Sequence, residues 1–160
     1  MTLPIGTYAR VALRPVEWRC PNCDKFLHVN AGHDGVVVRV VPPPADMEIA
    51  HVRGCNCDIP LPGGWNCFQH VGNVDRTVYA LPYTLLEPLE GAYLERVRRY
   101  PRTSGWAPDE HPTTAMRESA CATCGGPIAV QDPIVWDSRA LRASHRACAE
   151  GSFPDEPIIR

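Results

Sequence analysis

The sequence predicts a small α+β fold in which two cysteine-rich segments lie on either side of one helix. Three observations support this prediction. The eight cysteines fall mostly in closely spaced pairs, several short β-branched runs have the length of strands, and residues 88–100 carry apolar side chains at a helical period. The chain has 160 residues and 17 prolines, which is enough for one domain or for two small ones rich in turns.

The first half of the chain is predicted to consist of short strands and turns. Residues 7–18 contain a short alternating run and residues 35–41 are a β-branched run, so both are expected to form strands. Prolines at 42–44 predict a turn, and residues 47–52 could form the returning strand of a hairpin. Residues 60–66, with two prolines and two glycines, are predicted to be a further turn.

Four cysteines lie on either side of this predicted hairpin. Cys20 and Cys23 precede it with a two-residue gap, which lets both sulfurs reach one metal ion from a tight turn, and Cys55 and Cys57 follow it. Thiolates and imidazoles are the ligands that zinc prefers. We therefore expect these four cysteines to bind one Zn²⁺ in a zinc ribbon.

Two further residues compete for this first metal site. Cys67 and His70 are three residues apart, a spacing that also lets both side chains reach one ion. In the alternative ligand set, one of them joins Cys20, Cys23 and one cysteine of the second pair. Otherwise Cys67 is expected to be a small buried residue and His70 a surface or hydrogen-bonded one, and His33 is interpreted as an ordinary polar residue.

The segment Cys20-Pro-Asn-Cys23-Asp-Lys-Phe-Leu, followed by Glu48-Ile49 and a second cysteine pair, is similar to the Com family of small phage zinc proteins. Members of that family have Cys-x-x-Cys as their second pair, whereas this chain has Cys-x-Cys. The resemblance implies an RNA-binding regulator of translation.

One strand and one helix are predicted to follow. Residues 76–81 have strand character, and residues 88–100 are predicted to form a helix that begins near Pro88 and ends before Pro101. The core-facing stripe of this helix is expected to consist of Leu89, Tyr93, Val97 and Tyr100. The densest basic cluster of the chain lies on and just beyond its other side and consists of Arg96, Arg98, Arg99 and Arg102.

The C-terminal segment carries the clearest metal motif. Cys121-Ala-Thr-Cys124 is followed by Gly125-Gly126, which supply the backbone freedom that a tight turn around a metal needs. His145-Arg-Ala-Cys148 supplies two further zinc ligands. The predicted site is therefore a second, closed zinc site with four protein ligands.

Strands over residues 128–136 and a helix over Arg139–Glu150 are expected between and around these ligands. Asp137-Ser138 offers an N-cap for the helix and Gly151 a C-terminal stop. On such a helix His145 and Cys148 share one face, and Leu141 could pack beneath the metal.

This segment resembles a treble-clef zinc finger, and its spacing resembles the first half of a LIM domain. No Cys or His follows Cys148, whereas a LIM domain needs a second module, so the resemblance implies a single zinc module. The predicted organisation is a zinc-ribbon domain over 1–100, a linker without periodicity over 101–118, a treble-clef finger over 119–151 and a tail over 152–160.

Composition narrows the function classes. The net charge of −2 argues against a generally basic nucleic-acid binder, and no apolar run is long enough to span a membrane. Eight cysteines without a secretion signal indicate a reducing compartment, so we expect the cytoplasm of a bacterial or phage-infected bacterial cell. The sequence contains no His-Glu-x-x-His, Gly-rich phosphate loop or Gly-x-Ser-x-Gly, and we expect no catalytic residues.

The expected function is a non-enzymatic regulatory binding module, held together by two Zn²⁺ ions, for a nucleic acid or a host protein. The alternative is a structural or adaptor subunit of a multiprotein assembly such as a phage particle. Candidate nucleic-acid contacts are the basic cluster Arg96, Arg98, Arg99 and Arg102 together with Arg139, Arg142 and Arg146, which are expected to line one face of the C-terminal helix.

Overall fold

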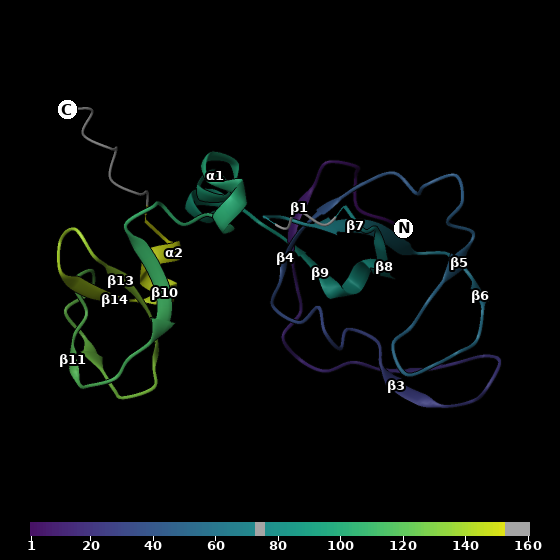
Figure 1. Cartoon of the computed structure of the whole chain (residues 1–160), viewed down its shortest axis with the longest axis horizontal. Helices are drawn as coiled ribbons and strands as arrows, with labels where there is room; N and C mark the ends of the chain where they lie inside the picture. Colours follow the sequence, from purple (N-terminus) through teal and green to yellow (C-terminus); the bar gives the residue numbers. More distant parts are fainter. Residues whose placement is uncertain (73–75, 153–160) are drawn as a thin grey trace. The chain divides into compact units, whose positions relative to one another are not determined.

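The computed structural model describes residues 1–72 and 76–152, and the chain divides into two compact units, Met1–Leu89 and Glu90–Arg160. In Figure 1 the first unit runs from purple to teal and the second from green to yellow. Both units combine short strands with little helix, so the predicted small α+β class is confirmed. The predicted tail, residues 152–160, lies outside the described residues except for Ser152.

A five-stranded antiparallel sheet forms the centre of the first unit, in the order β8-β7-β4-β1-β9. Its strands are β1 (Tyr8–Val11), β4 (Val37–Val40), β7 (Trp65–His70), β8 (Tyr79–Pro82) and β9 (Leu86–Pro88), with a 3-10 turn η1 (Tyr83–Leu85) before the last. The apolar side chains of these strands meet in one core, which includes Val11, Val38, Val40, Phe68 and Leu81. The strands predicted around residues 7–18, 35–41 and 76–81 are thus present, with shifted ends.

Two shorter hairpins complete the first unit. Strand β2 (Glu17–Arg19) pairs with β3 (Phe26–His28), and β5 (Ile49–Ala50) pairs with β6 (Ile59–Pro60). Each hairpin carries one of the two cysteine pairs of this unit, since Cys20 and Cys23 lie in the turn between β2 and β3, and Cys55 and Cys57 lie between β5 and β6.

The predicted returning strand over residues 47–52 is wrong. Only Ile49 and Ala50 are in a strand, and they pair with β6 and not with β4. Strand β4 pairs instead with β7, which begins at Trp65 within the segment predicted to be a turn. The reason is burial, because Phe68 lies opposite Val40 and is fully buried there.

The second unit contains a three-stranded antiparallel sheet, in the order β10-β13-β14, and two short helices. The sheet consists of β10 (Glu110–Thr114), β13 (Pro133–Asp137) and β14 (Arg142–His145). Strands β11 (Ser119–Ala120) and β12 (Pro127–Ile128) form a separate small hairpin. The helices are α1 (Gly91–Arg99) and α2 (Arg146–Glu150), and a 3-10 turn η2 (Pro101–Thr103) follows α1.

The segment predicted to be a linker, residues 101–118, is in part a strand of this sheet. β10 pairs with β13 along its whole length, from Glu110 opposite Asp137 to Thr114 opposite Pro133. No strand pattern is visible in this segment, because every β10 residue after Glu110 is exposed and the strand has no apolar face. The predicted helix over 88–100 is present but begins at Gly91 and belongs to this unit, with Tyr93 and Val97 buried as expected.

The predicted helix over Arg139–Glu150 is shorter than expected. The Asp137 carboxylate accepts hydrogen bonds from the backbone N–H groups of Arg139 and Ala140, both at 2.9 Å, so this residue closes a hairpin turn in place of capping a helix. Leu141 has a φ of 54° in that turn and its side chain is 73% exposed, so it does not pack beneath a metal. Residues 142–145 then form β14, and the helix begins only at Arg146.

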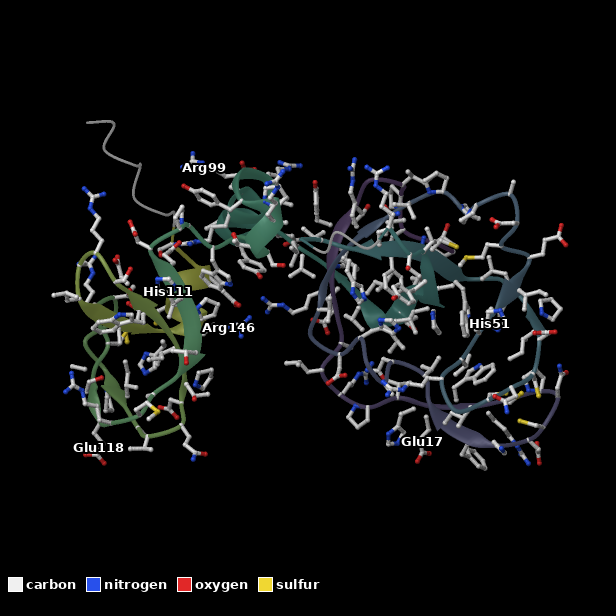
Figure 2. All side chains as sticks on the ribbon, viewed as in Figure 1. Glu17, His51, Arg99, His111, Glu118 and Arg146 are labelled. Carbon is white, nitrogen blue, oxygen red and sulfur yellow. The ribbon has the colours of Figure 1, made fainter. Side chains whose placement is uncertain are left out.

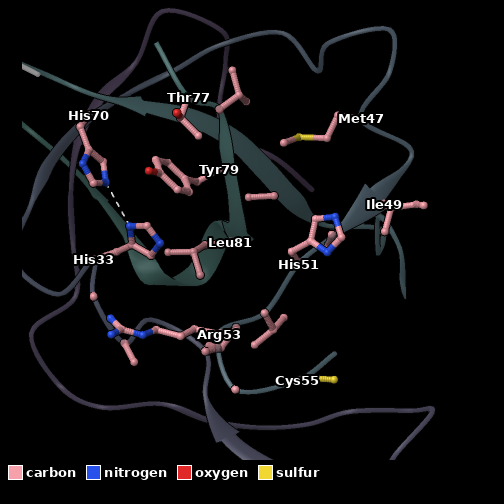
Figure 3. Close-up of a pocket in the computed structure, with 18 residues that line it drawn as sticks. His33, Met47, Ile49, His51, Arg53, Cys55, His70, Thr77, Tyr79 and Leu81 are labelled. Atoms are coloured by element: carbon pink, nitrogen blue, oxygen red, sulfur yellow. Dashed lines mark hydrogen bonds between the residues drawn. The ribbon is translucent and has the colours of Figure 1, made fainter. Parts of the chain in front are cut away.

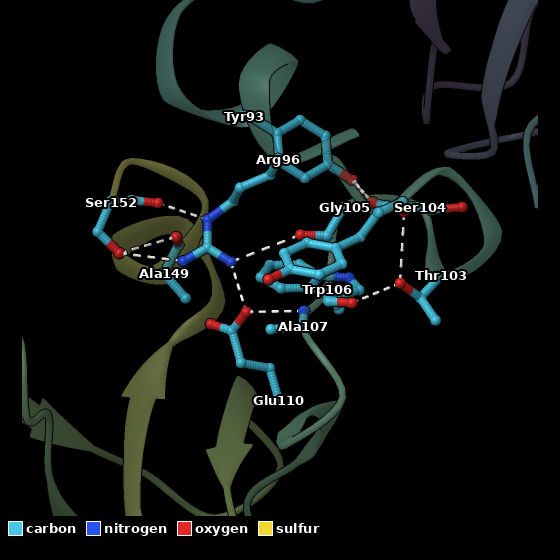
Figure 4. A network of polar contacts seen from close by, with 11 residues as sticks. Tyr93, Arg96, Thr103, Ser104, Gly105, Trp106, Ala107, Glu110, Ala149 and Ser152 are labelled. Atoms are coloured by element: carbon cyan, nitrogen blue, oxygen red, sulfur yellow. Dashed lines mark hydrogen bonds and ion pairs between the residues drawn. The ribbon is translucent and has the colours of Figure 1, made fainter. Parts of the chain in front are cut away.

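Arg96 is the centre of the second unit's polar network (Figure 4). Its side chain is only 1% exposed, which corrects its assignment to an exposed basic cluster. Nη1 lies 2.7 Å from Glu110 Oε1, Nε donates to the Ser152 carbonyl, and the guanidinium lies over the Trp106 ring. Glu110 also accepts the Ala107 N–H at 2.9 Å. One arginine thus joins α1, β10 and the end of α2.

We expect Arg96→Ala to lower the free energy of unfolding of the second unit by about 3–5 kcal/mol, because it leaves Glu110 nearly buried without its counter-charge. The matched control is Arg98→Ala on the same helix, whose pair with Glu95 is exposed and should cost no more than about 0.5 kcal/mol. Denaturant titration followed by the Trp106 indole NMR signal measures both. Equal effects of the two substitutions would contradict the role given to Arg96.

Candidate metal centres

The first cluster brings together Cys20, Cys23, Cys55 and Cys57, whose Sγ atoms all lie within 4.8 Å of one another. The Cys20 and Cys55 sulfurs are 3.4 Å apart, and those of Cys23 and Cys55 are 3.6 Å apart. These four residues are the ligand set that the sequence favoured, and the group could hold one metal ion.

The turn between β2 and β3 holds the Cys20 sulfur among backbone donors. The N–H groups of Asn22 and Cys23 point to Cys20 Sγ at 3.4 and 3.5 Å. Two backbone hydrogen bonds of 3.0 Å close the turn: the Cys20 N–H donates to the Lys25 carbonyl oxygen, and the Asp24 N–H donates to the Cys20 carbonyl oxygen. Asp24 has a φ of 64°. Burial alone raises the pKa of Cys20, but the N–H donors and the neighbouring thiols outweigh it and lower this pKa to about 6.

The second cluster brings together Cys121, Cys124, His145 and Cys148. His145 Nδ1 lies 3.4 Å from Cys124 Sγ and 3.8 Å from Cys148 Sγ. His145 Nε2 lies 2.9 Å from the Pro127 carbonyl oxygen, so Nε2–H donates to that carbonyl and Nδ1 is left to face the sulfurs. Such a partner on the far nitrogen fixes the tautomer and the ring orientation of a metal-binding histidine.

The second turn repeats the geometry of the first. Cys121 N–H donates to Gly126 O at 2.8 Å and Gly125 N–H to Cys121 O at 2.9 Å, and Gly125, at a φ of 74°, takes the place that Asp24 has in the first turn. The N–H groups of Thr123, Cys124 and His145 point to Cys121 Sγ at 3.3–3.5 Å. Burial again raises the pKa of Cys121 and these donors again overcome it, giving a pKa of about 5.

The donor sets and their spacing fit Zn²⁺. A tetrahedral zinc ion with Zn–S bonds of about 2.3 Å holds its sulfurs about 3.8 Å apart, close to the two sulfur–sulfur separations of 3.4 and 3.6 Å in the first cluster. All eight cysteines are free thiols, so none of them is held in a disulfide. Four thiols in one cluster, and three thiols with one imidazole in the other, are ligand sets of closed zinc sites.

The two alternative ligands lie outside the first cluster. Cys67 is buried with its Sγ 3.5 Å from Met47 Sδ, and this burial raises the pKa of its thiol. His70 Nε2 lies 3.0 Å from His33 Nδ1, so His70 is hydrogen-bonded, as expected, and His33 is its partner. No spacing rule could have found this pair, because the two residues are far apart in the sequence and only the sheet brings them together.

The arginines predicted to contact nucleic acid are placed differently from the prediction. Arg139 lies in the β13–β14 turn, Arg142 in β14 and Arg146 in α2, so they do not line one helix face. Arg146 pairs with Glu150 at 3.4 Å. Arg98, Arg99 and Arg102 are exposed, as expected, while Arg96 is buried in the network described above.

Comparisons with known proteins add no assignment. No protein-family model matches the chain, and searches of curated proteins and of solved structures find no match either. Within residues 1–72 and 76–152, neither helix is long and apolar enough to cross a membrane.

We expect Cys124→Ser to remove one of two bound zinc ions, to unfold residues 119–151 and to leave the first unit folded, because each cluster lies within one unit. Cys67→Ala is the matched control, since Cys67 is a buried thiol outside both clusters and should keep both ions. Native mass spectrometry counts the ions and proton NMR reports the folding of each unit. Native-like dispersion of the 119–151 signals in Cys124→Ser would contradict the prediction.

Zinc binding at pH 7 is expected to release protons at both clusters. The Cys55 and Cys23 sulfurs raise the pKa of Cys57 to about 12, and burial with the neighbouring thiols raises that of Cys148 to about 11. Both thiols are therefore protonated before the metal arrives, and zinc binds thiolates, so each must lose its proton. The affinity of both clusters for zinc should therefore fall as pH falls. The fall should be steepest below about pH 5–6, where Cys20 and Cys121 also take up protons.

Calorimetric zinc titrations in two buffers of different ionisation enthalpy measure this proton release. Observed heats that are the same in both buffers at pH 7 would show that no proton leaves and would contradict the prediction.

Proposed function

We propose that the chain is a non-catalytic regulatory binding protein whose two units are each held together by one structural zinc ion. The observation that carries this proposal is that each cluster supplies four protein donors. Four donors saturate a tetrahedral zinc ion, whereas a catalytic zinc keeps one position for water or substrate. The free thiols of all eight cysteines support a reducing cellular compartment, such as the bacterial cytoplasm.

We further propose that the first metal module is a Com-like zinc ribbon and the second a treble-clef finger. Support for the first comes from two cysteine pairs carried by two short hairpins, β2–β3 and β5–β6. Support for the second comes from its order of elements, which is a cysteine turn between β11 and β12, a hairpin β13–β14, and helix α2 carrying the last ligand, Cys148.

A single-stranded nucleic acid is the first candidate partner. The resemblance to RNA-binding regulators favours it, and so do the exposed arginines at the end of α1 and in η2. Arg99 extends outward from α1 (Figure 2), and Arg102 is exposed in the following turn. Acidic and basic residues are nearly balanced in each unit, so such binding would depend on a few local contacts and not on a broad basic field.

A protein partner, as in an adaptor or structural subunit, is the second candidate. Met116 is 91% exposed and Val130 is 51% exposed. They are neighbours in the fold, because Gln131 N–H donates to Ala115 O at 2.7 Å. Adjacent exposed apolar side chains of this kind occur at protein-interaction sites.

Fluorescence anisotropy with a labelled random-sequence RNA at 50 and 200 mM salt tests the first candidate. We expect the binding constant to fall as the salt concentration rises. In the double variant Arg99→Gln/Arg102→Gln, the slope of log binding constant against log salt concentration should be smaller in magnitude by about 1.4, because each phosphate contact on a single strand contributes about 0.7. Arg14→Gln/Arg39→Gln, two exposed arginines of the first unit, is the matched control and should leave the slope unchanged.

Lack of RNA binding at 50 mM salt, or equal slopes for the two double variants, would contradict the nucleic-acid candidate. Retention of the native fold after complete zinc removal by a chelator would contradict the structural role of the metal, whichever partner the chain binds.

A further inference from the structure

The first unit contains a cavity of about 620 Å³ that neither metal cluster occupies (Figure 3). Its walls come from the turn around residues 29–33, the loop from Met47 to Cys55, and strand β8 with the residues just before it. The lining residues within the described ranges 1–72 and 76–152 include one arginine and three histidines but no Asp or Glu: Arg53, His33, His51 and His70. The polar side chains described in the cavity therefore include one cation, Arg53, and three imidazoles.

Two of these imidazoles are held in place by aromatic rings. The His33 ring centroid lies 4.6 Å from that of Tyr79 and 5.6 Å from that of Phe68. His70 stacks on Tyr79 at 5.0 Å with an interplanar angle of 24°. His33 Nδ1 is engaged with His70, and the other His33 nitrogen lies on the far side of the ring, toward Leu81 (Figure 3). No hydrogen bond joins that nitrogen to any residue in the ranges 1–72 and 76–152.

Arg53 supplies the permanent charge of the cavity. It is exposed, and no hydrogen bond or ion pair joins its guanidinium to any residue in the ranges 1–72 and 76–152. A Cβ on Gly32 would lie 3.0 Å from Arg53 Nη1, so the glycine leaves room for the guanidinium beside the turn that carries His33. Five N–H donors in a planar fork are thus available next to two fixed imidazoles.

The cavity also has apolar lining residues. Met47, Ile49 and Leu81 line it, and Leu81 belongs to the buried core of the unit. A largely apolar pocket with a few convergent polar groups is typical of small-molecule sites, and its volume lies in their usual range.

We propose that this cavity binds a small organic oxyanion, a phosphate or a carboxylate, through Arg53 and His33, with the ligand's apolar body against Met47 and Leu81. A guanidinium fork matches the paired oxygens of both groups, which is why arginine recognises phosphates and carboxylates alike. This site goes beyond the proposed binding function and does not depend on which macromolecule the chain recognises.

A metal ion is a poorer occupant of the same cavity. Across the described residues, groups of three or more metal-ligating side chains occur only in the two cysteine clusters, so His33 and His70 have no third ligand within reach. The positive charge of Arg53 would also repel a cation at this position.

Anion binding should strengthen as pH falls. Burial lowers the pKa of His33, the charges of His70 and Arg53 lower it further, and Asp34 opposes them only in part. His33 is therefore neutral in the free protein at pH 7, and a bound anion would raise its pKa. Affinity then grows as pH falls from about 8 to 5 and His33 takes up a proton in the complex.

The experiment is an NMR titration of the zinc-loaded chain with phenyl phosphate and with benzoate, read at the imidazole Hε1 signals of His33 and His70. Phenol, which has the same ring and no charge, is the control ligand. We expect saturable shifts with one or both anions, and tighter binding at lower pH. If only phenyl phosphate binds, the ligand class is organic phosphates. If only benzoate binds, the ligand class is organic carboxylates.

We expect Arg53→Gln to weaken binding at least about tenfold, through the loss of a charged hydrogen bond. Arg39→Gln, an exposed arginine of β4 that lies outside the cavity lining, should leave it unchanged. Native mass spectrometry should find both zinc ions in each variant, which separates a lost contact from a lost fold.

Three results would overturn the proposal. They are an absence of saturable shifts up to about 10 mM of either anion, shifts with phenol as large as with the anions, and affinity that is independent of pH and of Arg53.

Discussion

The crowding of thiol ligands into two small clusters is the constraint on which the rest of the structure depends. Sulfurs 3.4–3.6 Å apart in the first cluster repel one another as thiolates, and backbone N–H donors compensate only part of that charge. A divalent cation bound in the cluster would compensate the rest. The clusters are also part of the hydrophobic cores, because Cys20 and Cys55 pack with Val29 and Val52, and Cys121 packs with Ile128. We therefore expect metal binding and core formation to be one event in each unit.

The sequence predicted the members of both clusters because most of them fall in closely spaced pairs, and the geometry within a pair is local. A Cys-x-x-Cys turn encodes its own hydrogen bonds, and the two turns differ only in whether Asp24 or Gly125 takes the left-handed position. Strands β1, β4 and β8 were also predicted from their sequences, whereas β7 was missed although Asn66, Cys67 and Phe68 in it are buried. Where the prediction failed, a local side chain had a competing role, since the Asp137 carboxylate closes a hairpin where a helix cap was expected. Strand β10 shows no apolar alternation because all of its residues after Glu110 are exposed.

The remaining features depend on contacts between distant residues, which a single sequence does not encode. Arg96 has the spacing of an exposed helical residue, and only the pairing of β10 with β13 brings Glu110 to it. His33 and His70 meet because β4 and β7 are neighbours in the sheet. The residue types do not reveal the Arg96–Glu110 pair or the His33–His70 pair either, because arginine and histidine are ordinary surface residues in most sequences. These features change the functional interpretation more than any shifted strand end does.

The first metal cluster and the cavity are built from one stretch of chain. Ala50, Val52 and Arg53 line the cavity, and Cys55, two residues further on, is a member of the cluster. Val52 and Cys55 are joined by a backbone hydrogen bond of 3.0 Å, so the position of the cluster fixes the position of the wall that carries Arg53. Apart from the cluster, the regular secondary structure in the loop from Met47 to Cys55 is the two-residue strand β5. Because so little secondary structure holds this loop, we expect a metal ion in the cluster to fix the wall that carries Arg53, so that the proposed anion binding in the first unit depends on that metal.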